Sequence, residues 1–499
     1  MQSVCSLLFL RSRNPVSEES LVTANRLARK RGPDSTSVQR ARDNDGWHTV
    51  SLHNLLDISG RAVVQPVFGG GEHSHLSVLF NGEIYNFREI GGGESDTSIL
   101  IPAFVKYGSR IGDALVGEFS IVVFDRAANA LHTFTDPFLT KPLYWGTNSA
   151  GEYGVSTNAS ALRTLGLTTI CMEDPNSSSE VKFQESGFGR VVSGPAVEFD
   201  IRQTEKSYSR WEEAFLAAVE QRGTHGAHKP TVFLSSGYDS GAICLALNRL
   251  GIDYETISIC ANENAEVLRQ RIEINGRGSA RSHISIQSLD QEASSRASTD
   301  IQRNVEPFQY THEDMPGRIG SLQTDGGAIG GWELSRLISE RGGKVVISGS
   351  GADEIISDYG FGGERFYSHS EFGGLFPDSL EGFFPWKKFY GDSQRSYLFK
   401  DEYILGRFGL EGRFPFLDRN VVQEFLSLEA GLKNRCYKAP IEWFLRKHDY
   451  PVELSVKRGF SPSELLNPQS AHVAQHTTKA RQVIGRVLSM LRLRKNGGA

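Results

Sequence analysis

The chain has few cysteines and no long apolar run, and each shortage excludes a class of protein. No stretch of the 499 residues reaches the roughly 18 apolar residues of a membrane span. Arg11 and Arg13 follow the mildly apolar first ten residues rather than precede them, unlike a secretory signal. Neither a disulfide framework nor a zinc spacing is formed by the five scattered cysteines, Cys5, Cys171, Cys244, Cys260 and Cys436. We therefore expect a soluble, cytoplasmic protein.

The chain also has no large excess of either charge. A net charge of −5 offers no general attraction for nucleic acid or an anionic membrane, so neither is expected as a partner. With 39% hydrophobic and 23% charged residues the composition is that of an ordinary globular protein. Because 499 residues are too many for one hydrophobic core, two domains are expected.

The most informative segment is a small-residue loop after a predicted strand. The apolar run from Thr231 to Leu234 leads into the loop residues 235–240, which end on Asp239 and Ser240, and a helix is predicted to start near Gly241. Small residues let backbone N–H groups converge on phosphate oxygens, and a helix N-terminus adds positive potential. Alone, such a loop is more often an ordinary strand-to-helix turn.

A second unit of the same construction follows about a hundred residues later. Lys344 to Ile347 is predicted as a buried strand, and Ser348 to Glu354 as its exit loop. Adjacent strands of a doubly wound sheet bring such loops together, so Asp239 and Asp353 are expected to clamp one magnesium pyrophosphate.

With both loops in view, the chain resembles the asparagine synthetase B family over nearly its whole length. The first loop is similar to that family's S-G-G-x-D-S motif, with Ser236 replacing a glycine, and the second to its S-G-x-G-[AS]-D-E motif. Further matches in the second half are Glu411 to Asp418, Lys438 to Arg446 and Lys457 to Phe460. Those in the first half are Arg31 to Asp34, Gln65-Pro66, Asn81 to Asn86, Ser95 to Thr97, Gly117 to Phe119, Asp136-Pro137 and Lys141 to Tyr144.

The resemblance implies a fold class and a domain order. Residues 1–205 are expected to form an Ntn-type αββα sandwich, because short β-prone runs crowd this half: Val4 to Leu10, Leu76 to Phe80, Ser120 to Phe124 and Leu131 to Phe134. Residues 206–470, from the helical spacing of Trp211 to Val219 onward, are expected to form a parallel α/β PP-loop synthetase domain. Loops are predicted at Asp174 to Ser179 and Ser186 to Gly194, and a basic amphipathic tail, most simply packed on its own domain, at 471–499.

For the second half, the resemblance implies ATP-dependent adenylation of a carboxylate, with Mg²⁺ and backbone donors offsetting phosphate charge. Asp239 and Asp353 are the expected magnesium ligands, and Lys438 is expected to stabilise charge when an amine displaces AMP. Glu411 and Arg413 are expected to form an internal ion pair. The expected ATP contacts are Leu234 and Ile259 at the adenine and Ser235, Ser236, Gly237, Ser240, Ser348 and Gly349 at the phosphates.

For the first half, the resemblance implies a glutaminase in which an N-terminal cysteine attacks glutamine and its own amine is the base. Cys5 is the candidate nucleophile, Asn81 and Gly82 the oxyanion donors, and Glu83 and Asp96 the ligands of the substrate's α-amino group. Yet four residues precede Cys5, so its nitrogen is an amide unless they are removed. A cysteine that merely packs a strand is the alternative.

Three departures from the family pattern put the substrates in doubt. Leu52 stands where the family carries an arginine for the glutamine carboxylate. Ser350 replaces the acid of asparagine synthetases and the tyrosine of β-lactam synthetases, and a hydroxymethyl group cannot act as a base near neutral pH. Tyr238 replaces a leucine before Asp239.

Three functions remain open on the sequence. The leading one is an asparagine synthetase-like ligase that joins a carboxylate to nitrogen from glutamine, ammonia or another amine. The second is an intramolecular amide-forming synthetase, of the β-lactam synthetase or lasso-peptide cyclase kind, with a vestigial first domain. The third is a non-catalytic nucleotide-binding protein, which the retained Asp239, Asp353 and Lys438 disfavour. A homodimer is left open, and His53, His283 and His448 are interpreted as surface or structural residues.

Overall fold

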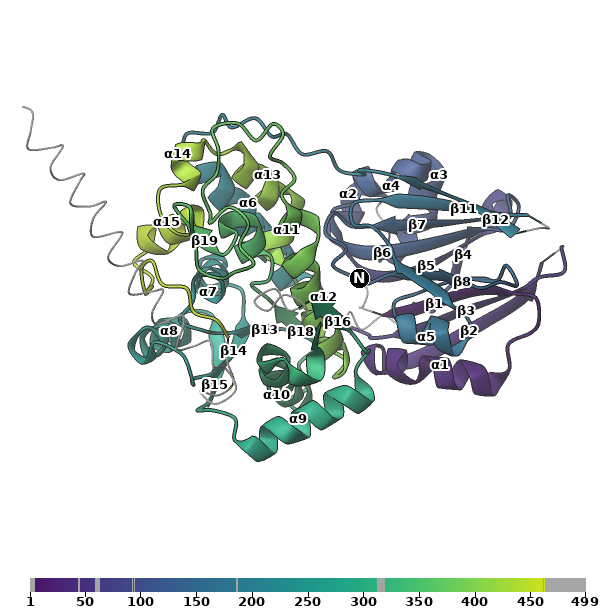
Figure 1. Cartoon of the computed structure of the whole chain (residues 1–499), viewed down its shortest axis with the longest axis horizontal. Coiled ribbons are helices and arrows are strands. Elements are labelled where there is room, and N and C mark those ends of the chain that lie inside the picture. The colour runs from purple at the N-terminus through teal and green to yellow at the C-terminus, as the bar shows by residue number, and fades with distance from the viewer. Residues whose placement is uncertain are drawn as a thin grey trace, which may run out of the picture.

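The computed structural model describes residues 5–43, 45–58, 63–91, 93, 95–184, 187–311, 319–460 and 462. The chain forms a strand-rich N-terminal part and a mixed C-terminal part that pack side by side (Figure 1). The C-terminal tail predicted at 471–499 lies outside the described residues. In the part of the chain that is described, no helix combines the length and hydropathy needed to cross a bilayer.

Two six-stranded antiparallel sheets stack in the N-terminal part, with helices on both outer sides (Figure 1). The first sheet has the order β10-β8-β9-β1-β3-β2 and contains β1 Ser6–Ser12, β2 Ser35–Arg42, β3 His48–Leu55, β8 Tyr144–Thr147, β9 Tyr153–Ser156 and β10 Thr169–Met172. The second has the order β12-β11-β7-β6-β5-β4 and contains β4 Val67–Phe68, β5 Leu76–Ile84, β6 Gly117–Asp125, β7 Ala130–Thr135, β11 Ser178–Gln184 and β12 Gly187–Ser193. The covering helices are α1 Glu18–Arg31, α2 Phe87–Ile90, α3 Leu100–Tyr107, α4 Ile111–Ala114 and α5 Ala159–Thr164.

Strand β5 shows why this sandwich has two cores. All nine of its residues are buried, and alternate side chains point to opposite faces of the sheet. Leu79 joins the core between the two sheets, whereas Val78 and Phe80 join the core beneath α3. The largely apolar run from Leu76 to Phe80 therefore marks a strand covered on both faces.

The predicted loops at Asp174 to Ser179 and Ser186 to Gly194 are wrong in part. Strand β11 already begins at Ser178, and residues 187–193 form β12, which pairs antiparallel with β11. Glycine normally weakens a strand, but β12 is an edge strand whose one partner supplies its ladder.

The C-terminal part is built on a five-stranded parallel sheet of order β15-β14-β13-β18-β21. Its strands are β13 Pro230–Phe233, β14 Tyr254–Ile259, β15 Ala280–Ile286, β18 Val345–Ile347 and β21 Glu411–Arg413. The chain moves outward from β13 to β15 and then returns to β18 on the other side of β13. This reversal creates a switch point between β13 and β18, where ligands bind at the carboxyl ends of parallel strands.

Helices surround this sheet, and short ribbons lie beside it. The helices are α6 Ser209–Thr224, α7 Tyr238–Leu250, α8 Ala265–Arg277, α9 Gln291–Asn304, α10 Gly326–Glu340, α11 Lys387–Tyr390, α12 Asp392–Gly406, α13 Arg419–Ser427, α14 Ala430–Lys433 and α15 Ala439–Lys447. The ribbons are β16 Gln309–Thr311 with β17 Ile319–Ser321 and β19 Gly360–Phe361 with β20 Glu364–Arg365. The sandwich and the parallel sheet confirm the predicted fold class.

Candidate functional site

The first loop leaves β13 and enters α7, and side-chain hydroxyls hold its backbone. Helix α7 begins at Tyr238, three residues before the predicted start, so Asp239 lies in its first turn. Gly237 caps the helix without a side-chain bond. The Ser240 hydroxyl accepts from the N–H of Ser235 at 3.0 Å, and the Ser235 hydroxyl accepts from the N–H of Gly237 at 3.1 Å. These bonds hold the loop in a tight turn at the N-terminus of α7, the end of a helix that favours an anion.

A buried arginine supports this loop from behind. Arg271 on α8 donates from Nη1 to the carbonyls of Ser235 and Gly237, both at 2.6 Å. A Cβ at Gly241 would lie 2.6 Å from the Arg271 Cζ atom, so glycine there lets the guanidinium pass beneath the helix. The Ser236 N–H and hydroxyl both bond to the Glu263 carboxylate.

The second loop lies directly against the first, as the sequence predicts. A Cβ at Gly349 would lie 2.7 Å from the Cβ of Asp239, so only a glycine allows this approach. Gly351 has a φ of +94°, a conformation that side chains rarely adopt. The two loops meet at the switch point between β13 and β18.

Lys438 joins the two predicted magnesium ligands. Its Nζ lies 2.7 and 2.8 Å from the two carboxylate oxygens of Asp239, and 2.9 Å from Oδ1 of Asp353. Lys457 contacts the other oxygen of Asp353, and the Tyr437 hydroxyl donates to Oδ1 at 3.0 Å. Because both carboxylates are within hydrogen-bond distance of one nitrogen, they are close enough to share one cation.

The two carboxylates of this group titrate differently, and burial raises the pKa of Asp239. Burial raises the pKa of the Asp353 carboxyl, but the ammonium groups of Lys438 and Lys457 outweigh burial and hold that pKa below its ordinary value. Asp353 is therefore ionised at neutral pH. Two carboxylates at one point fit Mg²⁺, a hard cation that prefers oxygen ligands together with substrate phosphates.

The cavity beside these loops has a volume of about 540 Å³. Its wall includes the predicted phosphate contacts Ser235, Gly237, Ser240, Ser348 and Gly349 together with both aspartates and Lys438. Three other predicted ATP contacts, Leu234, Ser236 and Ile259, are buried and do not line it. Leu234 and Ile259 belong to hydrophobic cores on either side of the sheet.

Asp401 is a site residue that the sequence does not reveal. Its Oδ2 accepts from the hydroxyls of Ser350 at 2.6 Å and Ser348 at 2.9 Å, and burial raises the pKa of this carboxyl. A carboxylate from α12 thus lies beside position 350, and α12 also carries Lys400 to the cavity wall. None of the sequence motifs named above falls in α12, so the fold is what reveals Asp401 beside the second loop.

Tyr238, which stands where the family carries a leucine, makes structural contacts. It is buried, and its hydroxyl donates to Glu442 at 3.0 Å and accepts from the N–H of Ser455 at 2.9 Å. This side chain ties α7 to α15 and the segment after it.

The predicted glutaminase residues gather at the end of β5. Asn81, Gly82, Glu83 and Asp96 are all buried. Gly82 has a φ of +134°, and a Cβ there would lie 1.9 Å from the Glu118 carbonyl oxygen. The backbone N–H of Cys5 donates to Oδ1 of Asn81 at 3.0 Å, which brings Cys5 to the predicted oxyanion donor.

Burial and a backbone contact hold Cys5 inside the fold. Cys5 is fully buried just before β1, and its carbonyl accepts from Nε of Arg31 at 3.0 Å. Leu52, at the position where the family carries an arginine, packs in the core between the sheets. The alternative of a packing cysteine therefore stays open beside the catalytic one.

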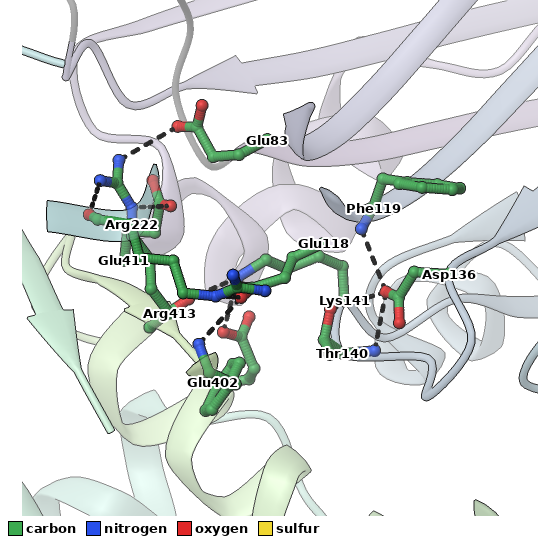
Figure 2. A network of polar contacts seen from close by, with 12 residues as sticks. Glu83, Glu118, Phe119, Asp136, Thr140, Lys141, Arg222, Glu402, Glu411 and Arg413 are labelled. Carbon is green, nitrogen blue, oxygen red and sulfur yellow. Dashed lines mark hydrogen bonds and ion pairs between the residues drawn. The ribbon is translucent and has the colours of Figure 1, made fainter. Parts of the chain in front are cut away.

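Buried ion pairs join the two parts of the chain (Figure 2). Nζ of Lys141 lies 2.9 Å from Glu402 and donates to the Gly412 carbonyl at 2.7 Å. Arg222 binds Glu118 at 2.7 Å, and Arg31 also contacts Glu402. The predicted internal pair of Glu411 and Arg413 is confirmed at 2.8 Å, and Figure 2 labels both residues.

Two protein families match this chain. Residues 3–183 match the glutamine amidotransferase domain family and residues 210–402 the asparagine synthase family. The putative glutamine-hydrolyzing asparagine synthetase 1 of Methanocaldococcus jannaschii is 25% identical over 77% of this chain and 71% of its own length. For glutamine-hydrolyzing asparagine synthetase 1 of Arabidopsis thaliana the values are 26%, 82% and 67%. For the asparagine synthetase of Triphysaria versicolor they are 24%, 95% and 81%.

The fold, the paired loops and these matches define a carbon–nitrogen ligase with an amidotransferase domain in front of a synthetase domain. The chain belongs to the asparagine synthetase B family.

Proposed function

We propose that the protein adenylates a carboxylate with ATP and then forms an amide, releasing pyrophosphate and AMP. Aspartate or an analogue is the proposed carboxylate, and glutamine or ammonia the nitrogen source. The observation that carries the proposal is the contact of Lys438 with both Asp239 and Asp353 at the switch point of the parallel sheet. This is the arrangement expected for a site that handles the phosphates of a nucleotide.

The first step joins a substrate carboxylate oxygen to the α-phosphorus of ATP and breaks that phosphorus's bond to the pyrophosphate oxygen. The hydroxyls of Ser235 and Ser240, which line the cavity, and the N-terminus of α7 orient the phosphates. Asp239 and Asp353 would hold Mg²⁺, which supplies charge stabilisation on the phosphates when bound. Lys457 adds a second ammonium group beside Asp353.

The second step joins the amine nitrogen to the acyl carbon and breaks the bond to AMP. Lys438 is placed to stabilise the negative charge on the acyl oxygen and on the departing phosphate. The amine loses a proton, and Asp401 is the carboxylate placed to accept it, since Ser350 cannot. Burial raises the pKa of Asp401, which makes it a better proton acceptor than an exposed aspartate.

For nitrogen from glutamine, the first domain supplies Asn81 and Gly82 as oxyanion donors and Glu83 and Asp96 as ligands of the α-amino group. Cys5 is the proposed nucleophile, and its own amine can serve as the base only after the four preceding residues are removed. Intact mass of the native N-terminus and glutamate release from glutamine test this part. An uncleaved N-terminus with no glutamate release would leave ammonia or another amine as the donor.

The second candidate function is intramolecular amide formation. Two observations favour it: Leu52 packs in the core where the glutamine-binding arginine is expected, and Ser350 with Asp401 replaces the family's acid. Comparing AMP formation from aspartate plus ammonia with that from substrates able to cyclise separates the two candidates.

The test of adenylation is carboxylate-dependent exchange of labelled pyrophosphate into ATP, with aspartate assayed first. We expect exchange in the wild type that depends on Mg²⁺, and its loss in Lys438→Met. Lys447→Met, on the same helix α15 with an exposed side chain, is the matched control and keeps wild-type exchange. Equal exchange in Lys438→Met, or ADP and phosphate as products, would contradict the proposal. No exchange with any carboxylate would favour the non-catalytic alternative.

A further inference from the structure

A second group of buried ligand atoms lies between the two parts of the chain. Glu83 at the end of β5, Asp96 before α3 and His225 after α6 each offer one donor atom, and these atoms lie within 4.8 Å of one another. All three residues are buried. Their sequence separation is so large that no spacing motif could reveal them.

Two of the three side chains are buried without hydrogen bonds among the described residues. Neither carboxylate oxygen of Glu83 nor Nε2 of His225 has a hydrogen-bond partner there, although the two side chains approach to 2.5 Å. The Glu83 side chain is 0% exposed and that of His225 is 8% exposed. Buried polar atoms are normally satisfied, so these three need an explanation.

The His225 ring is held in a fixed orientation toward the acids. Tyr85 and Phe87 meet it edge to face, with ring centroids 5.2 and 6.1 Å away. The His225 carbonyl accepts from Nη1 of Arg413 at 2.7 Å. Metal-binding imidazoles are commonly fixed by such surrounding contacts.

Asp96 is oriented in the same way by backbone donors. Its Oδ2 accepts from the N–H of Ile84 at 3.2 Å and its Oδ1 from that of Thr97 at 2.8 Å. Each oxygen keeps a lone pair for a further ligand.

Further buried charges surround this group. Glu411 is a third buried carboxylate, and Arg413 is the guanidinium that faces it at 2.8 Å and Glu83 at 3.6 Å. Figure 2 shows this guanidinium between the two glutamates. Buried charge is expensive unless it is paired, so carboxylates gathered at one point favour a bound cation.

We propose that Glu83, Asp96 and His225 form a binding site for a divalent transition metal of the Zn²⁺ type. One imidazole nitrogen and two carboxylate oxygens leave a fourth position open, as in three-ligand zinc sites. With zinc–ligand bonds of about 2.0–2.2 Å, tetrahedral donors lie roughly 3.3 Å apart, so His225 and Glu83 separate by less than about 1 Å on binding. The mixed nitrogen and oxygen donors favour Zn²⁺ or Co²⁺ over Mg²⁺.

Metal binding at this site affects the use of glutamine as the nitrogen source. This consequence rests on the proposed function. Glu83 and Asp96 are also the proposed ligands of glutamine's α-amino group, so metal and glutamine exclude each other. Zn²⁺ then lowers glutamine-dependent amide formation and leaves ammonia-dependent formation unchanged.

The binding itself is tested on the full chain with Co²⁺ alone as the probe, followed by displacement with Zn²⁺. We expect one equivalent of Co²⁺ to bind saturably, with the visible absorption of a four-coordinate site. His225→Ala weakens binding at least 100-fold. His228→Ala, three residues away and outside the group, is the matched control and binds as the wild type does.

Failure to bind Co²⁺ saturably, or equal affinity in His225→Ala and the wild type, would overturn the site. Thermal unfolding of each variant checks that it is folded. Glu83→Gln serves as a second variant with the same expected loss if His225→Ala is unfolded. The Co²⁺ titration involves neither ATP nor a carboxylate. The result of this titration is therefore independent of whether the protein adenylates a carboxylate.

Discussion

Lys438 holds the centre of the proposed synthetase site at a local conformational cost. It has a φ of +51° at the N-cap of α15, a region that residues other than glycine seldom adopt. Such strain persists where surrounding contacts determine it, and it is common at functional sites. Here the contacts are the bonds from its ammonium to Asp239 and Asp353. A lysine in solvent would have no reason for this conformation.

Asp401→Asn is predicted to separate the two half-reactions. The amide keeps a hydrogen-bond acceptor for Ser350 but removes the base, so amide formation falls by about 10²–10⁴-fold. Pyrophosphate exchange changes less than tenfold, because adenylation needs no proton acceptor. Equal losses in both assays would contradict the assignment of Asp401 as the base. Asp392→Asn, in the first turn of the same helix and paired with Lys387, is the control.

His53→Leu is predicted to reduce the loss of stability in acid. Burial in β3 lowers the pKa of His53 to about 3, against about 6.5 in the unfolded chain. The unfolded state therefore binds the extra proton as the pH falls below 6.5, and the folded state is destabilised down to pH 3. At pH 4.5 this amounts to about 2–3 kcal/mol.

The measurement is the unfolding free energy, or the Tm, of both proteins at pH 7.5 and pH 4.5. At pH 7.5 His53 is neutral in both states, so that comparison isolates the packing change. A wild type and a variant that lose equal stability on acidification would show that His53 is not the cause.

At the scale of elements, the site depends on the strand, loop and helix formed by β13 and α7. The loop carbonyls of Ser235 and Gly237 accept from Arg271 on α8, while the N–H groups of residues 235–237 donate to side-chain oxygens, so both sides of the loop backbone are fixed. The guanidinium also donates to the Pro451 carbonyl at 2.9 Å, so it links the loop to the segment after α15. Arg271 thus positions the phosphate-binding loop without being on the wall of the cavity.

Arg271→Lys is predicted to loosen this loop. A single ammonium cannot make the three bonds of the guanidinium, and losing one or two of them amounts to about 1–3 kcal/mol. We expect the KM for ATP in pyrophosphate exchange to rise about 10-fold or more. Arg269→Lys, exposed on the same helix, serves as control. An unchanged KM in Arg271→Lys would contradict the positioning role.

Most of this unit can be predicted from the sequence. The features that cannot be predicted depend on contacts between distant elements. The β13 and β18 loops were found because small residues and an acid after a buried strand are local signals. Arg271 and Asp401 were missed because each reaches the site from a distant helix, through contacts that leave no local pattern. The sequence interpretation sets the start of α7 three residues too late, although Gly237 at the N-cap and Asp239 in the first turn fit a helix N-terminus. The β12 strand was missed because its glycines indicate a loop.

At the scale of the whole molecule, buried ion pairs tie the two parts together. Glu402 on α12 binds Lys141 of the first part at 2.9 Å, and its backbone carbonyl accepts from Nη1 of Arg31 at 3.0 Å. Arg31 in turn binds the Cys5 carbonyl. Since Asp401 directly precedes Glu402 on α12, one turn of this helix contacts the proposed synthetase site and, through Arg31, the backbone of Cys5.

Glu402→Gln is predicted to weaken this junction strongly. Neutralising a fully buried carboxylate leaves the charges of Lys141 and Arg31 uncompensated, which destabilises by about 3–5 kcal/mol. Thermal unfolding at neutral pH measures the loss. Glu340→Gln, in an exposed pair with Arg336, is the control and changes stability by at most about 1 kcal/mol. Similar Tm values for both variants would show that the junction does not depend on Glu402.

Length and motif order predict two domains, but not which surfaces meet. The ion pair of Glu411 and Arg413 was expected within the synthetase part alone, whereas Arg413 also faces Glu83 of the first part. The meeting of His225 with Glu83 and Asp96 depends on the same packing. Contacts between domains are set by the three-dimensional arrangement, and one sequence carries no periodic signal for them.

The central claim is adenylyl transfer at the point where Asp239, Asp353 and Lys438 meet. Its most direct measurement supplies a carboxylate substrate labelled with ¹⁸O and follows the label by mass spectrometry of the nucleotide products. The account predicts AMP that carries one ¹⁸O atom from the carboxylate. Unlabelled AMP, or label found in inorganic phosphate beside ADP, would contradict it.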